Sequence, residues 1–594
     1  MRQLVATALE LIERLYVHLP LKRSMYAVNP AQRLRLLRRR LDSSDGAALS
    51  DRDFYDEMLG TFSELRDLHT TFVLPEPFRS TTAYLPFSIE SCVVRGRLEY
   101  VVSHVMDEGR RDGFERGGVV THWNGIPIHR AVAINAEREL GSNPAARRAQ
   151  GIASMTIRWL GQSLPPDEHW VDVRFRPGGR SRATPSEIRF EWRAFQQDAT
   201  PHGHGVARAK ASARHAVGMD ERSEVERQIR RELFERRAKG PASRAFGRDK
   251  DVPSTMSDVF PACRNVVTKH GTFGYVRLAT FNVETDDAFL REFIRIVGRL
   301  SPRGLILDVR GNGGGLITAG ERMLQLLTPR PIEPSRFHFL NTPRTAQLAA
   351  AHTFLRPWKR SIDQSVETGT DFSQGFPLLP MAAYNDIGQQ YQGPVVLVTD
   401  ALCYSTTDIF AAGFQDHGIG TVLGVDAATG AGGANVWEYA LIASLAADSV
   451  LLPPRLPMDA SFRFAVRRVT RVGDNAGLAV EDLGVRPEVV HRRTRKDVLE
   501  RNVDLINRAA AILSQQPWQK LAVTRTSALS CRVTCTNINT VDAYLDNHPL
   551  QSHRVKASAF SLTLPRGARG TRAALRLEAF RNGRLVAATR LAVR

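Results

Sequence analysis

The stretch Pro394–Gly433, PVVLVTDALCYSTTDIFAAGFQDHGIGTVLGVDAATGAGG, decides the fold. It begins with an apolar strand pattern over Pro394–Val398, and a helical pattern starts near Ser405. The apolar face of that helix carries Ile409, Phe410 and Phe414. A hydroxyl at a strand-to-helix turn lies beside free amides and the positive end of the helix dipole, which suits a serine nucleophile. Serine is also a favoured N-cap residue, so this stretch alone leaves both roles of Ser405 open.

A second stretch has the same organisation. Gly304–Gly315, GLILDVRGNGGG, is an apolar strand that runs into a glycine-rich turn, and Leu316–Leu327 has a helical pattern. The turn lacks the Lys-Ser/Thr pair of a P-loop and the spacing of a dinucleotide fingerprint. Upstream, the strand pattern Tyr275–Leu278 is followed by a helix that Thr285 or Asp286 would cap. A strand-helix-strand order predicts an α/β fold with parallel strands and a right-handed crossover.

The two strand-turn-helix units resemble the core of the S41 peptidases, the family of C-terminal processing proteases and the tricorn protease. In that family D-x-R-x-N-x-G-G follows one strand, and S-A-S-E-I-F-A-x-A-x-Q-D follows a later one. The counterparts here are Asp308, Arg310, Asn312, Gly314 and Gly315, then Ser405–Ala411 with Gln415 and Asp416. The resemblance implies a crotonase-like core and a nucleophile at Ser405. It also implies an oxyanion hole made by the backbone amides of Gly314 (or its neighbour Gly313) and Thr406.

The chain departs from the processing proteases at the general base. Those enzymes carry a lysine twenty-five residues after the serine, and here that position is Gly430, in a loop without lysine. Tricorn-type members use a histidine at the end of the N-terminal helical region, and Asp67-Leu68-His69-Thr70 matches that element. Taken alone, His69 would more often be a structural histidine. The resemblance makes it the candidate base, while the residue that orients its ring is not identified, because Asp67 is too close in sequence.

A further acid is implied by the same resemblance. Glu481, in Gly477–Val489, matches the glutamate of the tricorn-type tetrad and would lie near the serine or the substrate through a bridging hydroxyl. Its alternative is an exposed acid in a turn. The predicted site therefore consists of Ser405, His69, Glu481, Gly314 and Thr406.

Composition shifts along the chain predict five regions. They are an N-terminal helical region (1–78), a PDZ-like β-rich domain (79–195), a charged insertion or linker (196–262), the S41 core (263–515) and a C-terminal β-sandwich-like appendage (516–594). The PDZ-like assignment depends on the hairpin pattern Phe114–Pro127, for which a generic β-rich spacer is the alternative. Within the insertion, Met219–Lys239 could form a solvated helix. Residues 329–392 are expected to form a lid or cleft wall, and Asp497–Leu513 a closing amphipathic helix.

Bulk properties narrow the functional classes. The 81 Lys and Arg residues against 62 Asp and Glu give a net charge of +19, but they are scattered, so we expect no nucleic-acid partner. Five cysteines do not form a disulfide framework, and Cys531 and Cys535 lack the second pair of a zinc site. We expect no metal and no cofactor. No apolar run reaches the length of a membrane span, and the N-terminus lacks a signal-peptide pattern, which favours a cytoplasmic protein. Many relatives of the processing type are nevertheless exported.

The preferred function is a serine endopeptidase or C-terminal-type peptidase that acts on peptide or protein substrates. Because the usual lysine is missing, a non-catalytic peptide- or ligand-binding protein on the same scaffold is the main alternative. A crotonase-like acyl-CoA enzyme is a third possibility, although no CoA-binding stretch stands out. The sequence predicts neither the cleavage preference nor the oligomeric state.

Overall fold

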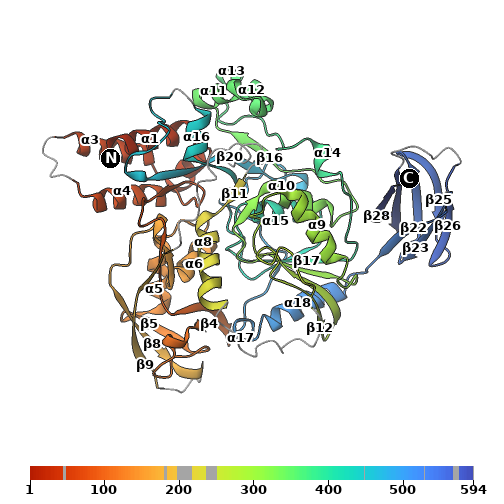
Figure 1. Cartoon of the computed structure of the whole chain (residues 1–594), viewed down its shortest axis with the longest axis horizontal. Helices are drawn as coiled ribbons and strands as arrows, with labels where there is room; N and C mark the ends of the chain where they lie inside the picture. Colours follow the sequence, from red (N-terminus) through yellow and green to blue (C-terminus); the bar gives the residue numbers. More distant parts are fainter. Residues whose placement is uncertain are drawn as a thin grey trace.

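The computed structural model describes residues 1–43, 49–179, 184–196, 217–235, 251–446, 449–527, 529–565 and 574–592. Figure 1 shows a central α/β core, with the N-terminal helices, a β-rich region and a separate C-terminal β domain arranged around it. Of the predicted insertion 196–262, residues 197–216 and 236–250 lie outside the described ranges.

The central sheet of the described chain has six strands in the order β12-β13-β14-β17-β18-β21. They span Ala262–Thr268, Gly271–Arg277, Leu305–Asp308, Val395–Thr399, Thr421–Gly424 and Val489–Val490. From β13 to β21 adjacent strands are parallel, and β12 is antiparallel to β13. Helix α9 (Asp286–Val297) connects β13 to β14, and Thr285 caps it as the sequence predicts.

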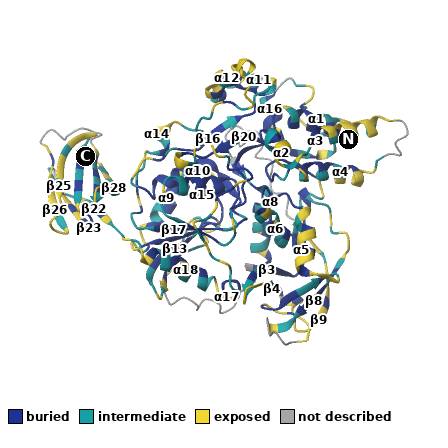
Figure 2. Ribbon diagram, turned by 180° about the vertical axis from the view of Figure 1, so that it is seen from behind, coloured by how far each residue is buried: buried dark blue, intermediate teal, exposed yellow. Residues whose placement is uncertain are grey.

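Helices cover both faces of this sheet because its strands are apolar on both sides. Leu305 and Leu307 of β14 belong to the same core as the apolar residues of α9, α10 (Ile317–Gln325) and α15 (Thr406–Asp416). The intervening Ile306 packs in a second cluster with α18 (Val503–Ser514) on the opposite face. Figure 2 shows these buried layers at the centre of the molecule. The carboxyl ends of the parallel strands therefore meet at one edge between two helical layers.

The N-terminal region is helical and is joined to the core. Its helices α1 to α4 span Arg2–Arg14, Leu19–Tyr26, Pro30–Asp42 and Asp51–Ser63. One apolar face of α4 (Phe54, Met58 and Phe62, with Leu65 just beyond it) is buried. Strand β1 (Thr71–Val73) then pairs with β20 (Ser461–Thr470), which also pairs with β16 (Arg336–Phe339) and β19 (Ala434–Glu438). This second sheet ties the start of the chain to the region that follows the serine helix.

Two larger β units lie outside these two sheets. One sheet joins β3, β4, β5, β8 and β9 (Phe87–Val94, Arg97–Val105, Val119–Trp123, Trp170–Arg176 and Ser186–Glu191), with β6 (Ile126–Pro127) paired to β5 in the expected hairpin. Helices α5 and α6 (Ile128–Glu137 and Pro144–Ala153) accompany it. In the C-terminal domain, the sheets β22-β23-β26 and β25-β24-β27-β28 share one apolar core. Their strands are Lys520–Ser527, Ser530–Thr536, Thr540–Leu545, His548–Arg554, Ala559–Thr563, Ala574–Arg581 and Arg584–Ala592.

Two predicted helices differ from the structure. The charged helix is α8 (Glu221–Arg230), and it is not solvated, since Arg222 is 3% exposed and bonds Glu139 and Glu226. The closing helix is broken into α17 (Arg495–Leu499) and α18, because the intervening residues 501 and 502 adopt left-handed backbone conformations that end a helix. In the part of the chain that the structure describes, no helix has the length and apolarity needed to cross a membrane.

Candidate active site

Ser405 occupies a strained turn between β17 and α15. Its φ of 62° and ψ of −120° are unusual for a residue with a side chain, and such strain is typical of functional turns. Although Ser405 is at the N-cap position of α15, its side chain makes no capping hydrogen bond. The hydroxyl instead contacts the imidazole of His69, with 2.8 Å between Oγ and Nε2. The capping interpretation of this side chain is therefore wrong.

His69 reaches the serine from a position 336 residues earlier in the chain. It follows α4 and precedes β1, whose pairing with β20 fixes the backbone at this point. Asp67 contributes to the same turn, because its Oδ1 accepts the backbone N–H of His69 at 2.8 Å. The ring of Tyr404 lies beside the imidazole, with 4.7 Å between ring centroids. The structure thus brings together two of the predicted site residues.

The surroundings of the His69 ring favour its neutral form. Burial lowers the pKa of His69 to about 3, and the nearby Asp67 carboxylate opposes this shift only in part. At neutral pH the imidazole is therefore unprotonated and able to accept a proton from a hydroxyl. Its other nitrogen, Nδ1, has no hydrogen-bond partner among the described residues. Asp67 accordingly holds the backbone of His69 and does not bond to Nδ1 of its ring.

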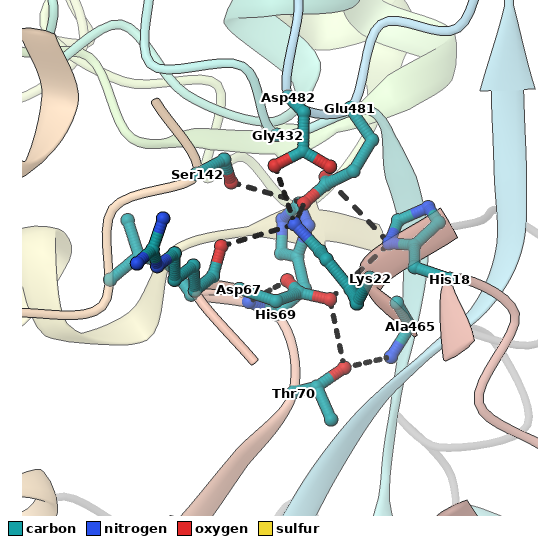
Figure 3. Close-up of polar contacts among 12 residues, drawn as sticks. His18, Lys22, Asp67, His69, Thr70, Ser142, Gly432, Ala465, Glu481 and Asp482 are labelled. Carbon is teal, nitrogen blue, oxygen red and sulfur yellow. Dashed lines mark hydrogen bonds and ion pairs between the residues drawn. The ribbon is translucent and has the colours of Figure 1, made fainter. Parts of the chain in front are cut away.

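Glu481 belongs to a buried charged network next to His69 (Figure 3). Its Oε1 lies 2.7 Å from Nζ of Lys22, which also lies 2.8 Å from Oδ1 of Asp482. The hydroxyl of Ser142 donates to Oε1 of Glu481 at 3.0 Å and lies 3.3 Å from the hydroxyl of Tyr404. Glu481 is 1% exposed, which excludes the exposed-acid interpretation. It is linked to the serine turn through Ser142 and Tyr404 rather than by direct contact with the serine hydroxyl.

Charges in this network compensate one another. Burial disfavours the Lys22 cation, but Glu481 and Asp482 outweigh burial and raise the pKa of Lys22. Burial also raises the pKa of Glu481, which Lys22 opposes. One possible ligand atom each from His18, Asp67 and Glu481 lie within 4.8 Å of one another, a spacing that a metal ion could bridge. Of these three residues, Glu481 already has the Lys22 ammonium as its cationic partner.

The glycine turn after β14 lies directly against Ser405. Gly314 has a φ of 99°, and a Cβ added there would lie 2.8 Å from Cβ of Ser405 and 2.9 Å from the amide nitrogen of Thr406. Only glycine fits this approach. In this structure the Gly314 amide donates to Oδ1 of Asn312 at 2.9 Å. The predicted oxyanion donors Gly314 and Thr406 are therefore adjacent to the nucleophile, but the first already has a hydrogen-bond acceptor.

The position of the lysine base in processing proteases has no room for a side chain here. Gly430 donates its N–H to the carbonyl of Cys403, and an added Cβ would lie 2.6 Å from that same oxygen. Asp408 fixes the rest of the loop by accepting the amides of Ala431 and Gly432. A lysine elsewhere does not replace this base, since Lys269 is exposed in the β12–β13 turn, at the amino ends of the parallel strands, whereas Ser405 follows the carboxyl end of β17.

Several residues of the site could not be found from local sequence patterns. Lys22 and His18 lie at or in a short helix with no distinguishing motif, and Ser142 precedes α6 in the β-rich region. Tyr404 is the exception, because its place directly before Ser405 could have suggested a role. The others become neighbours only through pairings of elements that are hundreds of residues apart.

Comparisons with known proteins agree with this architecture. Residues 272–448 match the profile of "Peptidase family S41". A "C-terminal processing peptidase, chloroplastic" of Tetradesmus obliquus is 39% identical over 77 residues, which are 13% of this chain and 16% of that protein. The solved structure of mature CPAF complexed with lactacystin has a TM-score of 0.60 at 14% identity and covers 86% of this chain and 98% of its own. Another structure of mature CPAF has a TM-score of 0.59 at 14% identity, with coverages of 86% and 97%.

The family profile and the similarity to a processing peptidase confirm the family that the sequence predicts, and the likeness to CPAF agrees with the fold. Residues 272–448 are therefore a region of the S41 peptidase type, and S41 peptidases are serine-type peptidases. The alignment with the curated relative spans only 16% of that protein's length, so its activity is not transferred with it.

Proposed function

We propose that the protein hydrolyses peptide bonds, as an endopeptidase or C-terminal-type peptidase, with Ser405 as nucleophile and His69 as general base. The observation that carries this proposal is the 2.8 Å contact between Oγ of Ser405 and Nε2 of His69. A serine hydroxyl is a weak nucleophile at neutral pH, and a neutral imidazole within hydrogen-bond distance can remove its proton as it attacks.

In the proposed reaction, Oγ of Ser405 attacks the substrate carbonyl carbon while His69 accepts the hydroxyl proton. His69 then gives this proton to the leaving amine, and a water molecule later hydrolyses the acyl-enzyme with His69 again acting as base. The oxyanion would be met by the amide of Thr406, at the start of α15, together with Gly314 or Gly313. For Gly314 this requires its N–H to turn away from Asn312.

Glu481 would act as a positioning residue in this scheme. Its carboxylate holds the hydroxyl of Ser142, which in turn lies 3.3 Å from the hydroxyl of Tyr404, the residue before the nucleophile. Tyr404 also flanks the imidazole of His69. Through these contacts Glu481 and Lys22 would fix the turn that carries both reacting groups.

We also propose the finer domain assignment: a crotonase-like core at 263–515, a PDZ-like domain at 79–195 and a C-terminal β-sandwich at 516–594. The mixed sheet with the β5–β6 hairpin supports the second assignment, and the two sheets with a common core support the third. A peptide or protein substrate follows from the peptidase assignment.

The direct test is active-site labelling with a fluorophosphonate, with the modified residue mapped by mass spectrometry. We expect label on Ser405, none on Ser405→Ala, and a labelling rate for His69→Ala reduced about 10²–10⁴-fold. Circular dichroism of each variant checks that the fold is kept. Equal labelling of wild type and Ser405→Ala would contradict covalent catalysis at this serine. A non-catalytic peptide-binding protein would then describe the chain better.

A further inference from the structure

A short strand from the charged insertion lies over the nucleophile. Strand β11 (Val217–Met219) pairs antiparallel with β15 (Gly314–Leu316), and the register places Gly218 opposite Gly315. The two strands form a two-stranded sheet of their own. Strand β15 is the glycine turn that contacts Ser405, so β11 occupies the backbone edge next to the proposed oxyanion donors.

Gly218 makes the closest approach to the serine. A Cβ added to it would lie 2.6 Å from Oγ of Ser405 and 3.0 Å from the carbonyl oxygen of Ala434. Its carbonyl oxygen accepts a hydrogen bond of 2.9 Å from Oγ1 of Thr406. The backbone of Gly218 lies outside the left-handed region, so lack of a side chain, rather than backbone freedom, makes glycine necessary here.

The strand is held in place on its C-terminal side. The amide of Asp220 donates to the carbonyl of Gly313 at 2.9 Å, and Nη2 of Arg463 donates to the carbonyl of Met219 at 3.0 Å. Helix α8 follows directly and is anchored by the buried ion pair between Arg222 and Glu139, whose atoms are 2.5 Å apart. Two hydrogen bonds and a buried ion pair therefore hold β11 and the start of α8 in place, as contacts hold a bound ligand.

The result is a closed active site. Ser405 and His69 are both 0% exposed, so a peptide cannot reach them while β11 is bound. The burial that lowers the pKa of His69 agrees with this closed state. A peptidase that binds extended peptides by adding them as a strand would use the same edge of β15 that β11 fills.

We propose that Val217–Met219 is an internal ligand of the peptide-binding edge of β15, which keeps the peptidase closed until it is displaced. The inference rests on the proposed function and adds a substrate class to it: extended peptides, paired antiparallel with Gly314–Leu316, that carry glycine at the position facing Ser405. Displacement of β11 opens the edge for such a peptide without any change in the catalytic residues.

The first experiment compares fluorophosphonate labelling rates of wild type, Gly218→Ala and a control, Gly298→Ala. Gly298 ends α9 with a φ of −64°, which alanine adopts without strain, and an added Cβ would lie 3.3 Å from the carbonyl oxygen of Ile294, a contact that requires a shift of only a few tenths of an ångström. We expect Gly218→Ala to label at Ser405 about tenfold faster or more, and Gly298→Ala to label like wild type. If all three proteins label Ser405 at one rate, the internal-ligand proposal is wrong while the peptidase proposal stands.

A second measurement does not depend on catalysis. Hydrogen exchange at the Asp220 amide should be faster in Gly218→Ala than in wild type, because the added Cβ displaces β11. In the double variant Gly218→Ala/Ser405→Ala the increase should be smaller, because the Oγ that the Cβ would contact is gone. Unchanged exchange in Gly218→Ala overturns the proposal. If exchange rises but no protein labels at Ser405, β11 is the ligand of a non-catalytic site, and only the peptidase proposal fails.

A peptide competition tests the substrate class. The peptide Ala-Val-Gly-Met-Asp-Glu, equivalent to residues 216–221, should slow labelling of Gly218→Ala. The same peptide with valine in place of glycine should slow labelling at least about tenfold less at equal concentration. Equal effects of both peptides would overturn the requirement for glycine.

Discussion

Nζ of Lys22, in the second helix of the chain, lies 2.7 Å from Oε1 of Glu481, 459 residues further on. The contact is fully buried and lies in the same cluster as His69 (Figure 3), so helix α2 forms part of the wall of the candidate active site. It joins α2 to the loop after β20, and the same lysine binds Asp482. The N-terminal helical region could be taken for an accessory domain, yet this contact joins it to the core.

Replacing Lys22 by methionine should destabilise the protein strongly. The change leaves the carboxylates of Glu481 and Asp482 buried without their cation, and loss of one partner of a buried ion pair typically costs about 3–5 kcal/mol. Urea unfolding measures this loss. The triple variant Lys22→Met/Glu481→Gln/Asp482→Asn also removes the two uncompensated charges. It should therefore regain a substantial part of the unfolding free energy that Lys22→Met loses.

The matched control is a lysine ion pair at the surface. Lys359 and Asp363 form an i,i+4 pair on α12 (Arg356–Asp363) with side chains 44% and 47% exposed. Lys359→Met should therefore cost at most about 1 kcal/mol. A Lys22→Met variant no less stable than Lys359→Met would show that the buried network does not stabilise the fold.

Acidification should destabilise the protein through His69. Its pKa is about 3 in the folded protein, whereas an unfolded histidine titrates near 6.5, so the unfolded state binds more protons between these values. The stabilising contribution is fully present above about pH 6.5 and is lost as pH falls towards 3. Between pH 7.5 and 5, wild type should lose about 2 kcal/mol more unfolding free energy than His69→Gln. Equal losses in urea titrations would contradict a buried neutral imidazole.

Gly314→Ala should impair both stability and labelling. Besides the strain of a positive φ, the added Cβ would lie 2.4 Å from the carbonyl oxygen of Gly218 and within 3 Å of the Ser405–Thr406 turn. Gly388 also has a positive φ, of 84°, but no atom lies closer than 3.7 Å to a Cβ added there. Gly388→Ala therefore measures the cost of the positive φ alone, about 1–2 kcal/mol of unfolding free energy. In thermal or urea unfolding, Gly314→Ala should be the less stable of the two alanine variants, and similar stabilities would argue against the close approach.

Restoring the lysine of the processing proteases should not restore a base. Gly430→Lys would place Cβ 2.6 Å from the carbonyl of Cys403, so the loop must shift and its contacts with Asp408 are lost. We therefore expect His69→Ala/Gly430→Lys to label no faster than His69→Ala. Recovery of labelling at Ser405 to the wild-type rate would show that the loop can adopt the lysine-dependent arrangement.

The parts of the fold that follow from local patterns could be predicted from the sequence. The strand-helix-strand unit from β13 to β14, the turn before α15 and the short strand after His69 all have periodic or capping signals within a few residues. The resemblance of these stretches to S41 peptidases predicts Ser405 and His69 as site residues, and the structure places them in contact.

The rest of the site depends on long-range pairing, which local patterns do not encode. The charged segment after Met219 has the composition of a solvated helix, yet α8 is buried because Arg222 finds Glu139 and Glu226. Gly218 carries no local signal, since its role depends on β11 meeting β15 about a hundred residues later. Likewise the break between α17 and α18 reflects two left-handed residues, neither of which is glycine.

The separation of 336 residues between the imidazole and the hydroxyl also constrains when activity can arise during synthesis. At about 5–20 residues per second, the ribosome exposes the histidine roughly tens of seconds before the serine, and Glu481 later still. In the proposed mechanism, a nascent fragment that ends before the serine helix lacks the hydroxyl that His69 would activate. The enzyme is thereby harmless to its own growing chain, and to its neighbours, until nearly the whole core has been translated.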